Sequence, residues 1–337
     1  SDQMGSSGVI ALNNGNYVIA SPNDDLSASN GGSVMLVDGS TGNPIGTAIG
    51  GTRAADNLGL AGVLALENGN YVIATSSVDS ASNADTGAII LVNGSTGTQI
   101  GSTLFGSSAN DALGSGSQRA LSNGNFVIAS QFVDGVQPTT GAVMLFNGAT
   151  GALINTISGD NHSDRLGSGG VTVLSNGNYV IGVPDDDKNG TILTDMGSVI
   201  LADGVTGLEI SRFEGNADNE SFGSNPGVTA LSNGHYVIAA SLDVVGGNTQ
   251  AGSVRLMNGT SGAQIGTAIE GDSANDSIGL NGITELSNDN YVIASRADDI
   301  PAGAGNDGSV KLINGTTAAL ISQVTGDANN DNIGVSG

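Results

Sequence analysis

An acidic loop in the middle of the chain has the residue types and spacing of a calcium-binding loop. Asp185, Asp187 and Asn189 alternate along it and a glycine follows, so the stretch reads DxDxNG. Calcium prefers oxygen ligands, and alternating carboxylate and amide oxygens before a glycine turn are typical of its loops. Thr191 offers a carbonyl and Asp195 a carboxylate, although the terminal glutamate of an EF-hand is missing. We predict calcium at these five residues, with a solvated acidic loop as the alternative.

A second, weaker pattern places two acids four residues apart. The pairs are Asp160 with Asp164, Asp272 with Asp276, and Asp327 with Asp331. These carboxylates are further metal candidates. However, aspartate side chains also accept hydrogen bonds from nearby backbone amides and hold tight turns. Asp56 and Asp111 occupy the same motif without an acidic partner, which favours the turn interpretation.

A catalytic constellation is not apparent. Nucleophilic catalysis needs a positioned base, and the chain has only two histidines, His162 and His235, which fall in different kinds of loop. The paired carboxylates do not stand out from the many other acids, and glycoside binding without a single tryptophan is unusual. We therefore expect no catalytic residue and no enzymatic activity.

The charge balance limits the possible partners. Eight lysines and arginines stand against 32 acids, for a formal charge of −24. Such a surface repels nucleic-acid phosphates and anionic lipid headgroups, and no apolar run reaches the roughly 18 residues of a membrane span. We expect no nucleic-acid partner and no direct membrane insertion. High acidity for solubility in salty water is another explanation for the charge.

These acids decorate a repeated unit. The stretch NGNYVIA at residues 14–20 returns five more times in altered form. Its aromatic residue is Tyr17, Tyr71, Phe126, Tyr179, Tyr236 or Tyr291, at spacings of 53 to 57 residues. A fixed internal period of this length indicates a repeat architecture. We expect these aromatics to lie in the core rather than to form a ligand-stacking set.

One repeat reads as four short strands. In the first copy they are expected at residues 8–12, 17–21, 33–37 and 44–49. An Asn-Gly pair between the first two predicts a type I′ hairpin, and the apolar runs on both sides predict strands covered on both faces. Four antiparallel strands per unit of about 55 residues match a β-propeller blade. Solenoid coils are usually shorter and parallel. The predicted fold is all-β: a six-bladed β-propeller of six four-stranded repeats.

A junction motif separates the repeats and occurs seven times, so the chain begins and ends at the same phase. The expected blades are 8–55, 62–110, 117–163, 170–219, 227–275 and 282–330, within one domain over 1–337, with the junction motif duplicated at 1–7 and 331–337. Six blades closing a ring and a piece of a longer array both fit this pattern.

The unit resembles the FG-GAP repeat of integrin α-subunit propellers and their bacterial relatives. The Phe-Gly of that family is matched by Phe222-Gly223, and its Gly-Ala-Pro is echoed by Ala20-Ser21-Pro22. The chain also looks like NGNYVIAS-type repeats of large bacterial surface proteins and adhesins. The family often has a calcium loop between its first two strands, but here that link is a bare Asn-Gly turn. Family ligands dock on the face with the loops between strands 2 and 3 and between blades.

In an up-and-down blade those two sets of loops share one end, and they contain 24 of the 32 acids. Two carboxylates about 4 Å apart repel by roughly 4 kcal/mol at an effective dielectric constant near 20, so converging acids need a cation or donors. We expect a non-enzymatic, extracellular cell-surface module that binds a protein or glycan through this acidic, calcium-loaded end. The alternative is a structural unit of a surface layer or fibre that assembles with copies of itself through its duplicated ends.

Overall fold

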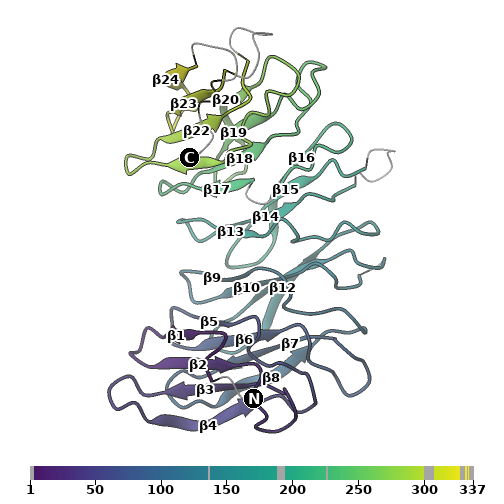
Figure 1. The fold of residues 1–337 in the computed structure, drawn as a ribbon, viewed down its shortest axis with the longest axis vertical. Coiled ribbons are helices and arrows are strands. Elements are labelled where there is room, and N and C mark those ends of the chain that lie inside the picture. The colour runs from purple at the N-terminus through teal and green to yellow at the C-terminus, as the bar shows by residue number, and fades with distance from the viewer. Residues whose placement is uncertain are drawn as a thin grey trace. The chain divides into compact units, whose positions relative to one another are not determined.

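A computed structural model of the chain describes residues 4–135, 137–187, 194–224, 227–299, 307–326, 331 and 333. All regular structure in these ranges is β-strand, and each repeat forms one four-stranded antiparallel sheet with its strands in chain order (Figure 1). The predicted fold class, all-β with six four-stranded antiparallel repeats, is confirmed. Among the described residues, no helix has the length and apolar character needed to cross a membrane.

The chain divides into two compact units, residues 1–167 with 204–207, and residues 168–203 with 208–337. The strands of the first unit are β1 Val9–Ala11, β2 Tyr17–Ser21, β3 Ser33–Val37, β4 Pro44–Gly50, β5 Val63–Ala65, β6 Tyr71–Thr75, β7 Ala88–Val92, β8 Gln99–Phe105, β9 Gln118–Ala120, β10 Phe126–Ser130, β11 Ala142–Phe146 and β12 Leu153–Ser158. Those of the second are β13 Val171–Val173, β14 Tyr179–Val183, β15 Ser198–Ala202, β16 Glu209–Glu214, β17 Val228–Ala230, β18 Tyr236–Ala240, β19 Ser253–Met257, β20 Gln264–Glu270, β21 Ile283–Glu285, β22 Tyr291–Ser295, β23 Ser309–Ile313 and β24 Leu320–Thr325.

The core lies between neighbouring sheets, because side chains alternate between the two faces of a strand. Val18 and Leu36 of the first sheet pack in one cluster with Tyr71, Ile73 and Ile90 of the second. All residues of β6 and β7 are buried, as expected for inner strands covered on both faces. Burying each such side chain contributes roughly 1.5 to 3 kcal/mol.

The strand-2 aromatics are core residues in five of the six sheets. Tyr71, Phe126, Tyr179, Tyr236 and Tyr291 are at most 1% exposed, whereas Tyr17 of the first sheet is half-buried. Burial raises the pKa of Tyr236 to about 12. The interpretation of these rings as core rather than as ligand-stacking residues is confirmed for these five.

The first strand of each repeat differs from the prediction. We expected it to be covered on both faces, but Val9 in β1 is 62% exposed and β5 is only half-buried. The reason is its position: this strand has three residues and lies at the edge of its sheet, so fewer neighbours cover it.

The Asn-Gly link between strands 1 and 2 is not the predicted type I′ turn, which needs positive φ at both central residues. In the first repeat only Gly15 has it, at +89°. The role of Asn14 lies in the hydrogen bonds of its side chain rather than in its backbone conformation. Its Oδ1 accepts from the backbone N–H of Asn16 at 3.1 Å, and its Nδ2 donates to the Gly94 carbonyl of the next sheet at 2.8 Å.

The same contact recurs along each unit and ties one sheet to the next. Two asparagines donate to one turn carbonyl: Asn14 and Asn16 to Gly94, Asn68 and Asn70 to Gly148, and Asn176 and Asn178 to Gly259. Asn233 donates to Gly315 in the same way. The NGN motif therefore joins neighbouring blades as well as forming a turn.

Replacing Asn68 and Asn70 together by alanine is expected to lower the free energy of unfolding by about 2 to 4 kcal/mol, because the buried Gly148 carbonyl loses both donors. Urea unfolding followed by circular dichroism measures the change. Asn43→Ala, at an exposed position in a β3–β4 turn, is the control and should change stability by less than about 0.5 kcal/mol. Equal losses in the two proteins would contradict this role.

Candidate functional site

The two ends of each blade differ in how constant their connections are. The strand 1–2 link always has five residues and the strand 3–4 link always has six. The strand 2–3 loop at the opposite end has 11 residues in two blades and as many as 14 in the fourth, between β14 and β15. Variation in length is thus concentrated in one set of loops on an otherwise constant frame.

In five junctions a buried acid holds that end together: Asp56, Asp111, Asp164, Glu220 and Asp276. Asp111 is 1% exposed, and its Oδ2 accepts from the backbone N–H groups of Ser107 at 2.6 Å and Ser108 at 2.8 Å. Asp56 makes the same pair of bonds with Thr52 and Arg53, each at 2.8 Å. In the second unit Glu220 accepts from Asn216 and Ala217, and Asp276 from Ser273.

The other carboxylate oxygen of the junction acid reaches the next blade. Asp111 Oδ1 accepts from the backbone N–H of Asp134, in the following strand 2–3 loop, at 3.2 Å. The corresponding bonds run from Asp79 N to Asp56, from Val244 N to Glu220 and from Asp299 N to Asp276. One carboxylate therefore closes its own turn and anchors a variable loop of the neighbouring blade.

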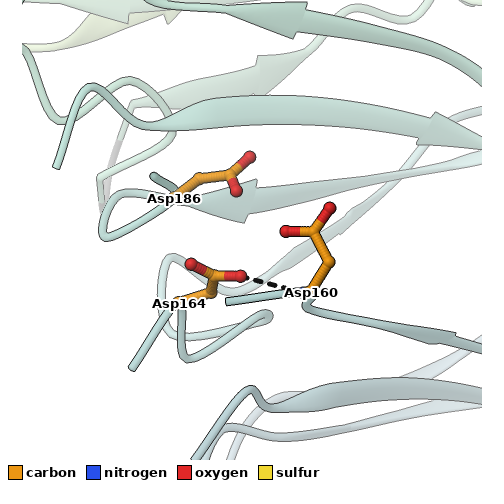
Figure 2. Close-up of side chains that lie close together, drawn as sticks. All are labelled: Asp160, Asp164 and Asp186. Atoms are coloured by element: carbon orange, nitrogen blue, oxygen red, sulfur yellow. Dashed lines mark hydrogen bonds between the residues drawn. The ribbon is translucent and has the colours of Figure 1, made fainter. Parts of the chain in front are cut away.

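This geometry accounts for the acids spaced four apart. Asp160 offers its backbone N–H to Asp164 Oδ2 at 2.9 Å, as the dashed line in Figure 2 shows. In other junctions the residue at this position is Thr52, Ser107 or Asn216, so the bond does not require an acid there. Asp276 lies in the same kind of turn, with Asp272 exposed beside it. Asp331 is exposed, and Asp327 lies outside the described residues.

The predicted calcium loop is described only in part. Asn189 and Thr191 lie outside the described residues. Asp187 Oδ1 accepts from the backbone N–H of Asp195 at 2.8 Å, and Asp185 is 3.5 Å from the hydroxyl of Ser168. The first of these bonds recurs in other strand 2–3 loops: Asp25 with Asn30, Asp79 with Asp85, and Asp134 with Thr139. Asp187 thus performs the loop-closing role of the repeat.

The acid between the two predicted ligands, Asp186, has a different environment. It is 4% exposed, accepts from the Ser198 hydroxyl and pairs with Arg212 on β16 at 2.9 Å. The same aspartate and serine recur as Asp243 with Ser253 and as Asp298 with Ser309, but their cations, Arg255 and Lys311, lie on strand 3 instead of strand 4. Sequence reasoning missed these ion pairs. The sequence does contain a signal for them. Serine begins strand 3 in the four blades that have this aspartate. In the two blades that have valine in its place, alanine begins strand 3 (Val78 with Ala88, Val133 with Ala142).

Asp160 and Asp164 lie close together in one junction of the first unit (Figure 2). Carboxylate oxygens are ligands that calcium prefers. The backbone N–H groups of Asp160 and Asn161 already donate to Asp164, so part of its capacity to accept is used within the turn.

The acids titrate differently according to their burial. Burial raises the pKa of Glu220 and Asp276 despite their bonds to backbone amides. A carboxyl whose pKa is higher in the folded state favours folding when protonated, so its contribution to stability falls as the pH rises through that range. The pKa of Asp38, a partly exposed residue in a strand 3–4 turn, is shifted in the opposite direction. The Ser40 hydroxyl, with the backbone N–H groups of Thr41 and Ser40, lowers its pKa to about 2.

A family model described as "Repeat of unknown function (DUF5650)" matches residues 11–47, 65–115, 120–162, 173–210 and 230–279. The chain belongs to this family. Each matched DUF5650 stretch begins at or next to the last residue of the first strand of a blade and includes the NGN link and strands 2 and 3. The longest matches also include the junction acid, as at Asp111 and Asp276. Each match thus runs continuously through strands 2 and 3 and the loop between them.

Among solved structures, the DUF5650 chain is similar to BamB from Moraxella catarrhalis, with 13% sequence identity and a TM-score of 0.41. The alignment covers 94% of this chain and 73% of that one. No curated protein matches the sequence.

Proposed function

We propose that this chain is a non-enzymatic, extracellular module that binds a protein or glycan at a cell surface through the strand 2–3 loop end of its blades. The observation behind this proposal is the distribution of loop lengths. Every other connection within a blade is constant, whereas the strand 2–3 loops vary from 11 to 14 residues. Variable loops on a rigid, repeated scaffold are the usual way to present a binding surface.

The bonds at this end support binding rather than catalysis. The junction acids and the loop-closing acids are engaged by backbone amides, for example Asp111 by Ser107 and Asp134 by Thr139. Acids held in this way fix loop shape and give the end a negative potential that attracts cationic groups. The likeness to FG-GAP propellers, whose ligands dock on the equivalent face, agrees with this proposal.

Exchanging one variable loop tests the proposal. Residues 184–197 are replaced by the shorter loop 241–252, which supplies Asp243 in place of the buried Asp186, and binding of the purified chain to a glycan array and to immobilised cells is measured. We expect binding to fall about tenfold or more for the targets that the original chain captures, with unfolding unchanged. The control exchanges two links of equal length at the other end, 203–208 for 147–152. Retained binding after the first exchange, or assembly of the chain into filaments, would contradict the proposal.

Calcium is the second part of the proposal, at the loop that contains Asp185 and Asp195. Isothermal titration calorimetry with calcium should show a binding heat for the original chain and its loss when Asp185 and Asp195 are both changed to asparagine. Asp187 is left unchanged because its carboxylate closes the loop. Asp85→Asn, another exposed loop acid, should leave the heat unchanged. A heat that persists in the double variant, or that sodium chloride reproduces, would remove calcium from this loop.

A further inference from the structure

The space between neighbouring blades has two versions in this chain. In the second unit it is filled by ionic side chains. Arg255 on β19 bonds Asp243 at 2.9 Å and Glu270 at 3.6 Å, and its guanidinium lies 5.2 Å from the ring centroid of Phe213 on the preceding blade. One blade further on, Lys311 on β23 pairs with the buried Asp298. In these two blades a long cationic side chain and the aspartate that it pairs with fill the space next to the preceding blade.

In the second and third blades the same positions are apolar. Val133, Ala142 and Met144 stand where the fifth blade has Asp243, Ser253 and Arg255. A cavity of about 400 Å³ opens there between the second and third blades, and Leu104, Phe105, Leu113, Val133, Ala142 and Met144 line much of it. This volume is within the range of small-ligand pockets, about 300 to 1,000 Å³.

A second cavity, of about 200 Å³, lies on the opposite side of the second blade, against the first. Ile49, Val78, Ala88 and Ile90 contribute its apolar wall. Here too valine, alanine and isoleucine replace the aspartate, serine and cation of the fifth and sixth blades. An apolar cavity of about 150 Å³ is enough to bind a benzene ring, so each of these cavities has room for a large side chain.

Strand β8 connects the two cavities. It is the edge strand of the second sheet, and within the described part of the chain no strand pairs with its outer side. Gln99 and Thr103 line the cavity toward the first blade, and Leu104 lines the cavity toward the third. Phe105 ends the strand, lines both cavities and is 42% exposed.

A strand added to β8 would send successive side chains to opposite faces of the second blade, as any strand does. Two adjacent apolar residues of that strand would therefore point one toward each cavity. The surroundings are acidic: Asp134 lies at the larger cavity and is exposed, and the whole chain carries a formal charge of −24. Opposite charge favours a basic partner.

We propose that the outer edge of β8 binds an extended, basic segment of another protein, with two adjacent apolar side chains of that segment filling the cavities on either side of the second blade. This surface is separate from the strand 2–3 loops to which we assign the proposed function, and either proposal can fail without the other.

The test compares hexapeptides by fluorescence anisotropy. One has Phe-Leu between pairs of lysines, a second has Ser-Ser in the same place, and a third has Phe-Leu between pairs of glutamates. We expect the first peptide to bind about tenfold or more tightly than the second, since each buried apolar side chain adds affinity, and the third to bind weakest. Hydrogen exchange should show new protection of backbone amides in β8 when the first peptide is bound.

Two variants make the test specific. Val133→Asp, Ala142→Ser and Met144→Arg together copy the filled version of the fifth blade without changing the net charge, and should abolish the preference for Phe-Leu over Ser-Ser. Phe105→Glu copies Glu270 at the equivalent position, and should reduce binding of the first peptide even though it adds a negative charge. Phe105→Glu is a single change at a partly exposed side chain, so it still tests the proposal if the triple variant does not fold.

The proposal is overturned if Phe-Leu and Ser-Ser peptides bind equally, if Phe105→Glu strengthens binding of the first peptide, or if β8 gains no protection. Concentration-dependent self-association in sedimentation velocity that Phe105→Glu abolishes would identify a second copy of the chain as the occupant, which also overturns the proposal of a basic partner.

Discussion

Changing Gly87 to alanine is expected to disrupt the second blade and to lower the free energy of unfolding by about 4 kcal/mol or more, a loss that only core or backbone disruption reaches. Gly87 precedes β7 with φ at +70° and forms a parallel bridge with Leu113 of the junction. A Cβ atom there would lie 2.3 Å from the backbone nitrogen of Leu113 and 2.4 Å from its oxygen. Backbone atoms on both sides of the bridge leave no flexible group that can move away.

The matched control is Gly124→Ala, in a strand 1–2 link. Its φ is similar, at +86°, but nothing lies within 4 Å of a Cβ built at that position. Only the conformational penalty applies, so we expect a loss of about 1 kcal/mol. Thermal and urea unfolding measure both variants. A loss at Gly87 no larger than that at Gly124 would show that the close approach to Leu113 does not constrain the blade.

Asp111→Asn should lower the free energy of unfolding by about 2 to 4 kcal/mol, although it changes only one oxygen to an amide nitrogen. Both carboxylate oxygens of Asp111 accept from backbone N–H groups, those of Ser107 and Ser108 on one side and Asp134 on the other. An asparagine has one acceptor oxygen, and its NH₂ group would face an N–H donor. Because the site is 1% exposed, water does not replace the lost acceptor.

Asp85→Asn is the control for this second change, because Asp85 is an exposed loop acid at a positive φ that asparagine tolerates. We expect its stability to change by less than about 0.5 kcal/mol. Chemical denaturation at neutral pH gives both values, and hydrogen exchange of the 131–141 loop should increase only in the Asp111 variant. Equal effects in the two proteins would mean that the junction acid does not tie the blades together.

Much of the fold could be predicted from the sequence because the repeat supplies six aligned copies. The expected strands at 17–21 and 33–37 coincide with β2 and β3, and the fourth strand differs from β4 by one residue. Alternating burial and fixed spacing determine these elements, and both are local properties of the sequence. The first strand was less predictable, since its exposure depends on its position at the sheet edge.

The roles of the acids could not be predicted in the same way. An acid such as Asp111 bonds its own turn and also Asp134, 23 residues away in the next blade, and spacing along the chain does not show a side-chain-to-backbone contact of that range. The ion pair of Arg255 with Asp243 requires two strands in register. Asp160 and Asp164 appear as a pair of possible ligands in the sequence, yet the bond between them uses the backbone of one.

The constant links have a consequence for how such genes change in length. Within each unit, one or two asparagines of a blade donate to a glycine carbonyl of the next blade, so adjacent repeats meet in a similar way. In-frame duplication or deletion of one repeat therefore recreates an existing junction instead of requiring a new one. We therefore expect related chains to differ in the number of repeats and in the length of the strand 2–3 loop more than in the other connections within a blade.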